Sequence, residues 1–292
     1  MLHQSENYLL KYSKKDLNVN AESYFIKLFS AHSDRIGDDG AIIDQRVYSN
    51  DAFCENVHFK RSWMSLTQIA YKSMLVNISD AIAMNATPQY ALLSVAIPSS
   101  YTFKELRELH AGFEMAAKKF GIDIIGGDTV SNNKLDISIT IISHTHRPLL
   151  RSGLRGGDLL AYTGSLGQSA RDLRYLLSGG KIHARSKFVQ FELRGAFIAD
   201  ATSVLSCGMD ISDGLGSDLE RLHSLNRVGF QLKKGLDKKI FCSGEEYEML
   251  VGFSPRYRKK LIRLAAKNRT PLTIFAKARR NSYKNCCKAH HF

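Results

Sequence analysis

Apolar residues recur with the spacing of a helix in three segments of the chain. Residues 63–84 carry apolar side chains near the 3.6-residue period, which predicts a helix with a broad buried face. Thr102 and Glu105 have the spacing of a capping box, so we expect a helix that begins after Thr102 and ends before Gly121. Residues 256–269 also show helical spacing, with a basic face turned to solvent.

Shorter apolar runs in the first half of the chain are typical of strands. Residues 41–59 contain two short extended runs, and residues 90–98 form a third that stops at a proline. A fourth run, residues 122–127, closes in the glycine-rich sequence GGDT, and residues 135–143 alternate as a half-buried strand does. Together with the helices, these runs predict a mixed α/β domain.

The pattern breaks at residues 144–158, where one proline and three glycines fall together. Beyond this break we expect a strand at 159–164, a glycine-containing turn, helices through about residue 206, and a strand at 248–253. A chain of 292 residues exceeds what one hydrophobic core usually organises. The sequence therefore predicts two domains, residues 1–148 and 149–292, of the α/β (α+β) class.

Composition argues for a soluble protein of the cytoplasm with no membrane contact. No run of 18 uncharged apolar residues exists, and the first residues are polar and mixed in charge, unlike a signal peptide. The five cysteines are an odd number without zinc-like spacing, and a neighbouring pair such as Cys286 and Cys287 rarely forms a disulfide. We therefore expect reduced thiols.

The net charge of +13 comes from one end of the chain. Residues 253–292 contain twelve of the 41 Lys and Arg residues and no acidic residue, which leaves 29 basic and 28 acidic residues elsewhere. Such a distribution favours a basic surface helix in solvent over a nucleic-acid-binding surface spread across the fold. A basic nucleic-acid-binding protein remains an alternative, and we expect no nucleic-acid partner.

Acidic residues recur in short turns beside apolar runs. Each one taken singly could cap a helix or form a turn. These turns are Gly37–Gly40, Asn50–Asp51, Ser79–Asp80, Gly127–Asp128 and Asp210–Gly214. If they converge, four to six carboxylates in one cleft require cations to stay ionised, and hard oxygen ligands suit Mg²⁺ with phosphate. The sequence therefore predicts a site for several magnesium ions and a phosphate-bearing substrate.

Phosphoryl transfer matches this donor set. The reaction requires positioning and charge neutralisation more than covalent help from the protein. The P-loop pattern GxxxxGK[ST] is absent, and GSLGQS at residues 164–169 is only loosely similar to a glycine-rich phosphate loop. We therefore expect an ATP-using phosphotransferase built on a different nucleotide-binding scaffold.

Seven motifs in one order resemble the thiamine-monophosphate kinase family of the AIR-synthetase-like superfamily. They are GDDGAII, ND-x6-HF, YKSMLVNISDAIAMNATP, GIDIIGGDT, RSGLRGGDLLAYTGSLGQSA, MDISDGLGSDLERL and GEEYEML, between about residues 36 and 252. The resemblance implies a two-domain AIR-synthetase-like fold and ATP-dependent phosphorylation of thiamine monophosphate to thiamine diphosphate with several Mg²⁺. It also implies a homodimer whose N-terminal mixed-sheet domains pair.

The same resemblance assigns roles to individual residues. The implied magnesium ligands are Asp38, Asp51, Asp80, Asp128, Asp210 and Asp213, with Ser49 and Asn50 beside Asp51. The implied ATP contacts are Gly127, Asp128, Arg151 and Ser212, and the implied substrate contacts are His58, Glu245 and Glu248. No residue is expected as a general base, because the attacking phosphate oxygen is already ionised.

This chain departs from the family pattern at several places. Asn50 replaces a threonine but keeps an oxygen ligand, Glu246 replaces an aspartate, and Asn85 stands where a glycine is usual and can adopt the left-handed conformation. Residues 229–243 are shorter than expected. Relatives of the hydrogenase-maturation dehydratase and selenophosphate synthetase types remain alternatives, although the cysteines on which those enzymes depend do not occupy the required positions.

Overall fold

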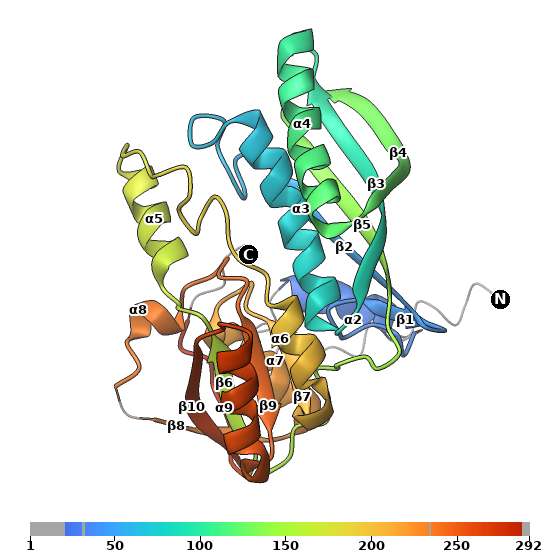
Figure 1. Cartoon of the computed structure of the whole chain (residues 1–292). Coiled ribbons are helices and arrows are strands. Elements are labelled where there is room, and N and C mark those ends of the chain that lie inside the picture. Colours follow the sequence, from blue (N-terminus) through green and yellow to red (C-terminus); the bar gives the residue numbers. More distant parts are fainter. Residues whose placement is uncertain (1–20, 31–32, 234, 288–292) are drawn as a thin grey trace, which may run out of the picture. The chain divides into compact units, whose positions relative to one another are not determined.

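The computed structural model describes residues 21–30, 33–233 and 235–287 (Figure 1). The described residues divide into two compact units, one before Asp38 and one that begins at Asp38. The first unit contains the helix α2 (Ala21–Ser30). Residues 1–20, whose sequence we expect not to form a signal peptide, lie outside the described residues. Within the described residues, no helix combines the length and apolar character needed to cross a membrane.

Five strands form the first sheet of the larger unit, in the order β1-β2-β5-β3-β4. They are β1 (Ala41–Ile43), β2 (Arg46–Cys54), β3 (Thr87–Pro98), β4 (Asp123–Asn132) and β5 (Asp136–His144). All neighbours are antiparallel except β3 and β4. A helical crossover joins these two, as parallel neighbours require. The expected mixed sheet is therefore present.

Two helices, α3 (Leu66–Ala83) and α4 (Phe103–Phe120), pack side by side beside this sheet (Figure 1). The Thr102 capping box is formed, and Gly121 ends α4 in the left-handed conformation, as the sequence predicts. Gly112 allows the helices to approach closely, since a β-carbon there would lie 2.2 Å from the carbonyl oxygen of Thr67. α3 is buried on almost every side, which explains its continuous apolar sequence.

The strand predicted to close at GGDT continues instead to Asn132. Parallel pairing with β3 carries the chain through Gly126–Thr129 in extended conformation, so these residues lie inside β4. Gly127 is required there, because a β-carbon would lie 1.7 Å from the carbonyl oxygen of Leu93 and its φ is +145°. The shape of the strand thus depends on its neighbour, which local sequence does not reveal.

The second sheet is wholly antiparallel, in the order β7-β9-β6-β10-β8. Its strands are β6 (Leu159–Thr163), β7 (Cys207–Asp210), β8 (Gly229–Leu232), β9 (Met249–Phe253) and β10 (Leu272–Arg279). The helices of this half are α5 (Gln168–Leu177), α6 (Gly195–Ala201), α7 (Leu215–Asn226), α8 (Lys238–Phe241) and α9 (Arg258–Lys267), with 3-10 turns η2 (Thr202–Val204) and η3 (Pro255–Tyr257). The sequence interpretation predicted β6 and β9 but not β7, β8 or β10.

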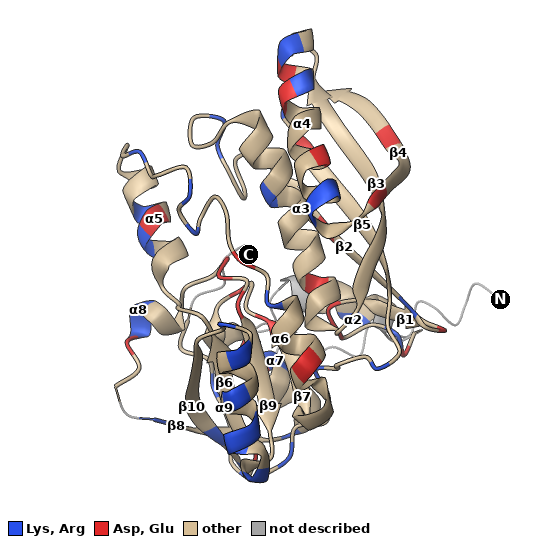
Figure 2. Ribbon diagram, viewed as in Figure 1, with Lys and Arg blue, Asp and Glu red and all other residues tan. Residues whose placement is uncertain are grey.

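Period-two alternation gives the second sheet two buried faces. Leu160 and Leu250 pack in one cluster with the leucines of α7, while their neighbours Ala161 and Val251 belong to another cluster that includes Leu261 of α9. The basic side chains of α9 point to solvent, and Figure 2 shows them as a blue stripe along the helix. The sheet is therefore covered on both faces by helices.

α3 connects the two halves of the larger unit, because it packs against β2, β5 and β3 and also against β7 and α6. The link between the sheets is hydrogen-bonded to both halves: the amide of Leu149 donates to the carbonyl of Met84, and the amide of Gly208 donates to the carbonyl of Leu150. Division into two domains at residue 148 stays a prediction.

Two local expectations have clear outcomes. Asn85 adopts the left-handed conformation with φ of +53°, as expected for a residue that replaces glycine, and its side-chain amide donates to the carbonyl of Arg147.

The expectation of reduced thiols is wrong for one pair, because Cys242 and Cys287 form a disulfide. These cysteines are 45 residues apart in sequence, and only tertiary packing brings them together.

Candidate functional site

Three carboxylates from distant segments converge between α3 and the second sheet. Asp39 lies in the loop before β1, Asp80 in the last turn of α3, and Asp210 at the end of β7. Each contributes a carboxylate oxygen to a group whose atoms all lie within 4.8 Å of one another. Oxygen-only ligands at this spacing suit a hard divalent cation. We call these residues the acidic cluster.

Burial and like charge make the acidic cluster costly to ionise. Burial raises the pKa of Asp80 well above its ordinary value, and the nearby carboxylates of Asp51, Asp210 and Asp39 raise it further. Burial and then the charge of Asp39 raise the pKa of Asp210 to about 7, although a hydrogen bond from Ser79 opposes the shift. Bound cations would relieve both costs.

Asp39 belongs to the acidic cluster, whereas its neighbour Asp38 lies beside the cluster. Asp39 is 9% exposed and pairs with the guanidinium of Arg151, whose Nε lies 3.1 Å from Oδ1 of Asp39. Asp38 instead accepts the backbone amide of Arg151 at 2.6 Å. The family resemblance implied a ligand role for Asp38 and not for Asp39, since two adjacent carboxylates in a loop carry no periodicity that distinguishes them.

Strand β2 presents Ser49 and Asp51 on the face that packs against α3. The Ser49 hydroxyl donates to the carbonyl of Asn77, and the amide of Asp51 donates to the side-chain oxygen of Asn77 at 2.7 Å. Asn77 is a fully buried residue of α3 that the sequence interpretation did not single out. It therefore fixes β2 beside the helix that carries Asp80.

Asn50 points away from this face, as alternation along a strand requires. Its side chain is exposed and bonds to the hydroxyls of Ser138 and Thr140 on β5. We call this side of the first sheet, opposite α3 and α4, the open face. The structure does not bring the side chain of Asn50 to the acidic cluster, and the period-two pattern of β2 could have revealed this.

Gly127 and Asp128 also lie away from the acidic cluster within one chain. Both are exposed on β4, and Asp128 pairs in register with Ser94 of β3. In the sheet order β4 lies three strands from β2, which at about 4.8 Å between neighbouring strands is roughly 14 Å. These two predicted nucleotide contacts are therefore separated from Asp51 by most of the sheet.

The loop after β7 carries the remaining predicted ligands. Asp213 pairs with the guanidinium of Arg221, which also donates to Asp218 at 2.9 Å. Asp218 is fully buried, burial raises its pKa well above the ordinary value, and its Oδ2 has no hydrogen-bond partner among the described residues. Ser212 lies in the same loop, and its carbonyl accepts the amide of Glu245 at 2.6 Å. Asp213 and Asp218 thus share one arginine.

The predicted substrate contacts occupy three different environments. His58 accepts the backbone amide of Cys54 on Nδ1, which leaves the proton of the neutral ring on Nε2, and its ring stacks on that of Phe53. Glu245 pairs with Lys72 at 2.8 Å. Glu248 is buried and accepts hydrogen bonds from Thr163, Lys187 and Arg194, which hold its pKa below the ordinary value against the effect of burial.

Lys72 is a buried cation that the sequence interpretation overlooked. It is fully buried in α3, with its ammonium 4.0 Å from the ring centroid of Phe188 and its charge balanced by Glu245. Lys72, Val76 and Asp80 repeat every four residues and so share one side of the helix. That spacing was the signal that could have identified it.

Glu246, the residue that departs from the family pattern, is buried and tied to its surroundings. It pairs with Lys187 at 2.9 Å, and it accepts the hydroxyl of Ser243 and the backbone amide of Gly167. The turn GSLGQS before α5 is therefore anchored to the GEEYE segment through a carboxylate. The longer side chain of glutamate is accommodated with its charge compensated.

Comparison with known proteins identifies relatives of this chain. A family model described as AIR synthase related protein, N-terminal domain, matches residues 37–144. Thiamine-monophosphate kinase of Rhodopirellula baltica is 34% identical over 211 residues, which cover 68% of this chain and 63% of that protein. The enzyme of Bacillus subtilis is 31% identical over 69% of this chain and 67% of its own length, and that of Leptospira interrogans 30% over 73% and 76%.

Solved structures agree on the fold. The structure named AaThiL complexed with AMPPCP and TMP has a TM-score of 0.78 and 22% identity, with 94% of each chain covered. A hydrogenase maturation protein, HypE, has a TM-score of 0.66 and 15% identity over 90% of this chain and 91% of its own. At such identities these structures establish the two-sheet α/β fold alone. The curated relatives, at 30% identity or more, show that this chain belongs to the thiamine-monophosphate kinase family of AIR-synthase-related proteins.

Proposed function

We propose that this protein transfers the γ-phosphoryl group of ATP to thiamine monophosphate, giving thiamine diphosphate and ADP, with several Mg²⁺ bound at the acidic cluster. The observation that carries the proposal is the convergence of Asp39, Asp80 and Asp210 from three distant segments. A structural role for all three is unfavourable, because buried like charges destabilise a fold unless cations compensate them.

The residues present fit Mg²⁺. Their donor atoms are oxygens only, burial raises the pKa values of Asp39, Asp80 and Asp210, and Asp51 lies close enough to raise the pKa of Asp80. We propose as holders Asp38, Asp39, Ser49, Asp51, Asp80, Asp210 and Asp213, without the side chain of Asn50. Bound Mg²⁺ would supply the positive charge that neutralises the phosphate oxygens.

The chain's own residues position the substrates. Arg151 and Arg221 now neutralise Asp39 and Asp213, and their planar guanidiniums can bind phosphate oxygens in the same bidentate way. His58 offers a ring N–H near the exposed end of β2, and Ser212 lies beside Asp213 for nucleotide contact. The acceptor is an ionised phosphate oxygen, so alignment rather than proton removal limits the reaction.

Glu245 and Glu248 contribute to the substrate site in different ways. Glu248 is saturated by Thr163, Lys187 and Arg194, so we propose that it positions the GEEYE segment. Glu245 keeps 19% of its side chain exposed and remains the candidate for contact with the thiamine moiety. This division follows from the number of hydrogen bonds each carboxylate already accepts.

We propose that the protein acts as a homodimer whose first sheets pair through the open face and the β4 edge. Apolar side chains are exposed there, including Leu92 at 36%, Ile125 at 55% and Val130 at 53%. An uncovered strand edge readily pairs with another chain. Gly127 and Asp128 would then serve a site that two copies complete. Sedimentation equilibrium of the wild type and of Ile125→Lys tests this proposal, and a monomeric wild type would contradict it.

Direct assay tests the activity. Purified protein is incubated with Mg-ATP and thiamine monophosphate, and the products are separated by anion exchange. We expect thiamine diphosphate and ADP in equal amounts, with turnover abolished in Asp80→Ala and Asp213→Ala but retained in Asp123→Ala, an exposed aspartate of β4. ADP without thiamine diphosphate would favour another superfamily reaction. Unchanged turnover in both variants would exclude the assigned metal site.

The alternative function, nucleic-acid binding, would use the basic face of α9. Lys259, Lys260 and Arg263 are exposed, and Figure 2 shows the cations in a row along the helix. Binding through this face predicts retention on DNA that weakens steeply with salt and is lost in the triple alanine variant. Absence of salt-sensitive retention would remove this alternative.

A further inference from the structure

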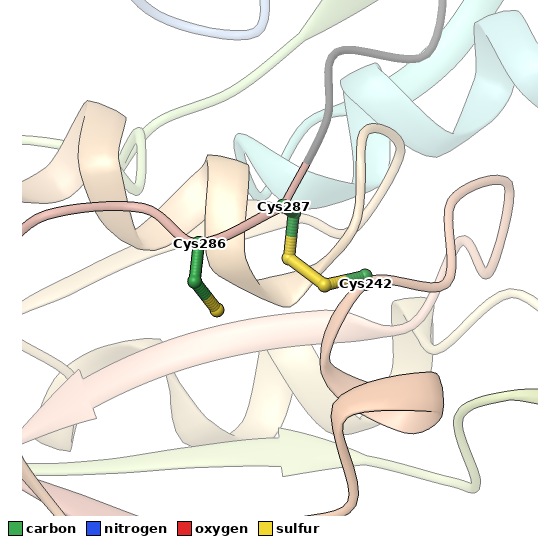
Figure 3. Close-up of side chains that lie close together, drawn as sticks. All are labelled: Cys242, Cys286 and Cys287. Carbon is green, nitrogen blue, oxygen red and sulfur yellow. A yellow bond between two sulfur atoms is a disulfide. The ribbon is translucent and has the colours of Figure 1, made fainter.

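Three cysteines gather at the end of the second sheet, outside the acidic cluster. Cys242 follows α8, and Cys286 and Cys287 lie in the segment after β10. Figure 3 shows Cys242 joined to Cys287 by a disulfide with Cys286 beside them. The sulfur atoms of all three lie within 4.8 Å of one another, and Cys286 is an exposed free thiol.

The disulfide joins residues 281–287, which we call the C-terminal strap, to the segment after α8, and the strap lies against the first turn of α7. The Tyr283 hydroxyl donates to the carbonyl of Gly216 at 3.0 Å, and the Asn285 amide donates to the hydroxyl of Ser217 at 3.2 Å. A β-carbon on Gly216 would lie 2.7 Å from Sγ of Cys287, so the strap presses directly on the helix backbone. Tyr283 also packs edge-on against Phe230.

Both ends of the disulfide adjoin loops that carry candidate site residues. The first turn of α7 follows Asp213 directly in sequence. A β-carbon on Gly214 would lie 3.3 Å from the carbonyl carbon of Cys242, and the next residue, Ser243, donates its hydroxyl to Glu246. The two ends of the disulfide therefore adjoin the DISDG loop and the segment that leads into GEEYE.

We infer that Cys242, Cys286 and Cys287 form a thiol–disulfide exchange site that takes small thiols and disulfides of the glutathione class. Its oxidised state holds the strap on α7, and its reduced state releases it. In the reducing compartment that the sequence predicts, disulfides are transient and serve redox sensing or catalysis. A free thiol beside a disulfide is the arrangement that exchange requires.

The exchange balances without any reagent beyond the small disulfide. In the reduced protein the exposed thiolate of Cys286 attacks the small disulfide. This step forms a mixed disulfide between Cys286 and the small molecule and releases one small thiolate. The Cys242 thiolate then attacks the sulfur of Cys286 and releases the second small thiolate. Finally the Cys287 thiolate attacks the sulfur of Cys242 and regenerates free Cys286. Two protein thiols lose two protons and two electrons, and one small disulfide gains them.

Thiol counting tests the exchange independently of enzymatic activity. The full chain, equilibrated with glutathione buffers of varied ratio, is denatured in acid and its free thiols are counted by alkylation and mass spectrometry. With five cysteines, we expect three free thiols in the oxidised state, at positions 54, 207 and 286, and five in the reduced state. Cys286→Ser should slow oxidation at least about tenfold without changing the end state.

Hydrogen exchange reports the structural consequence. Reduction should increase exchange in the strap and in the first turn of α7, while α4 serves as an internal reference that does not change. Cys242→Ser should show the reduced pattern in every buffer, because it removes the cysteine through which the strap is joined to the segment after α8. Cys54→Ser, which alters a cysteine of β2 outside the cluster, should behave as the wild type does.

The effect on nucleotide affinity rests on the proposed function. Reduction should raise the KM for ATP at least about fivefold, the lower end of coupling between linked sites, and Cys242→Ser should abolish this redox response. Five free thiols in every glutathione buffer would overturn the exchange site. So would hydrogen exchange in the first turn of α7 that is the same in the oxidised and the reduced protein. Normal thiol counts and α7 protection without phosphoryl transfer would instead reject the proposed function alone.

Discussion

The hydroxyl of Ser79 on α3 donates a 2.6 Å hydrogen bond to Oδ2 of Asp210 at the end of β7. Both residues are buried, and the bond joins the helix packed on the first sheet to a strand of the second. It favours the ionised form of Asp210, the form that binds a cation, against burial that raises the pKa to about 7.

Replacing Ser79 by alanine should weaken metal binding with little effect on the fold. A residue that does not itself bind the metal can hydrogen-bond to one that does, and loss of that bond typically lowers the affinity for the metal by about tenfold or more. Titration of activity with Mg²⁺ measures the change. Ser73→Ala is the matched control, because Ser73 is equally buried in α3 but donates only to the carbonyl of Ala70. Identical Mg²⁺ dependence in the two variants would exclude the role of Ser79.

Asp80→Asn should abolish turnover and yet stabilise the metal-free protein. Burial and three neighbouring carboxylates raise the pKa of Asp80, so removal of its charge relieves an unfavourable interaction. We therefore expect the free energy of unfolding of the metal-free protein to be higher in Asp80→Asn than in the wild type. Urea unfolding at pH 8 in EDTA measures it, with Asp123→Asn as control. A less stable variant would contradict a site that is built for cations.

We expect the charges of Lys72 and Glu245 to stabilise the fold only when both are present. Lys72→Met leaves the Glu245 carboxylate without its buried partner, and breaking such a pair costs about 3 kcal/mol. The double variant with Glu245→Gln should recover part of the loss, because neither charge remains. Denaturant unfolding of the two single variants and the double variant gives the coupling energy. Strictly additive losses would show that the two side chains act independently.

Glu248 predicts a defined pH dependence. Hydrogen bonds from Arg194 and the charges of Lys187 and Arg194 hold its pKa below the ordinary value of 4.5 despite burial. A carboxylate with a depressed folded-state pKa contributes stability that is present above pH 4.5 and lost as pH falls through the folded pKa. Glu248→Gln should therefore be less stable than the wild type by about 3 kcal/mol at pH 7, with a difference that shrinks below pH 4.5. A constant difference between pH 3 and 7 would contradict this assignment.

The elements that depend on local sequence were predictable. The helices α3 and α4 follow from apolar spacing and from the Thr102 capping box, and Asn85 adopts the conformation expected where glycine is usual. Strands β2, β3, β5, β6 and β9 follow from short apolar runs. β10 was missed because its basic residues merge with the charged C-terminal part of the chain, and β7 and β8 because each is only four residues long.

The candidate site was predictable as a set of carboxylates but not as a geometry. Order along the chain identified Asp80 and Asp210, yet the choice between Asp38 and Asp39 depends on the position of Arg151, more than a hundred residues away. Asn50 is excluded from the acidic cluster by strand alternation, which the sequence already contains.

By itself the sequence determined the family, the buried helix α3, and a supply of aspartates at the edges of apolar segments, because motif order and periodicity are local properties. Only the tertiary structure decided which carboxylates meet, that Lys72 and Glu248 are neutralised inside the fold, and that Cys242 reaches Cys287. Those outcomes depend on contacts between residues tens to hundreds of positions apart, and in a protein interior each charge must find its partner or share a cation.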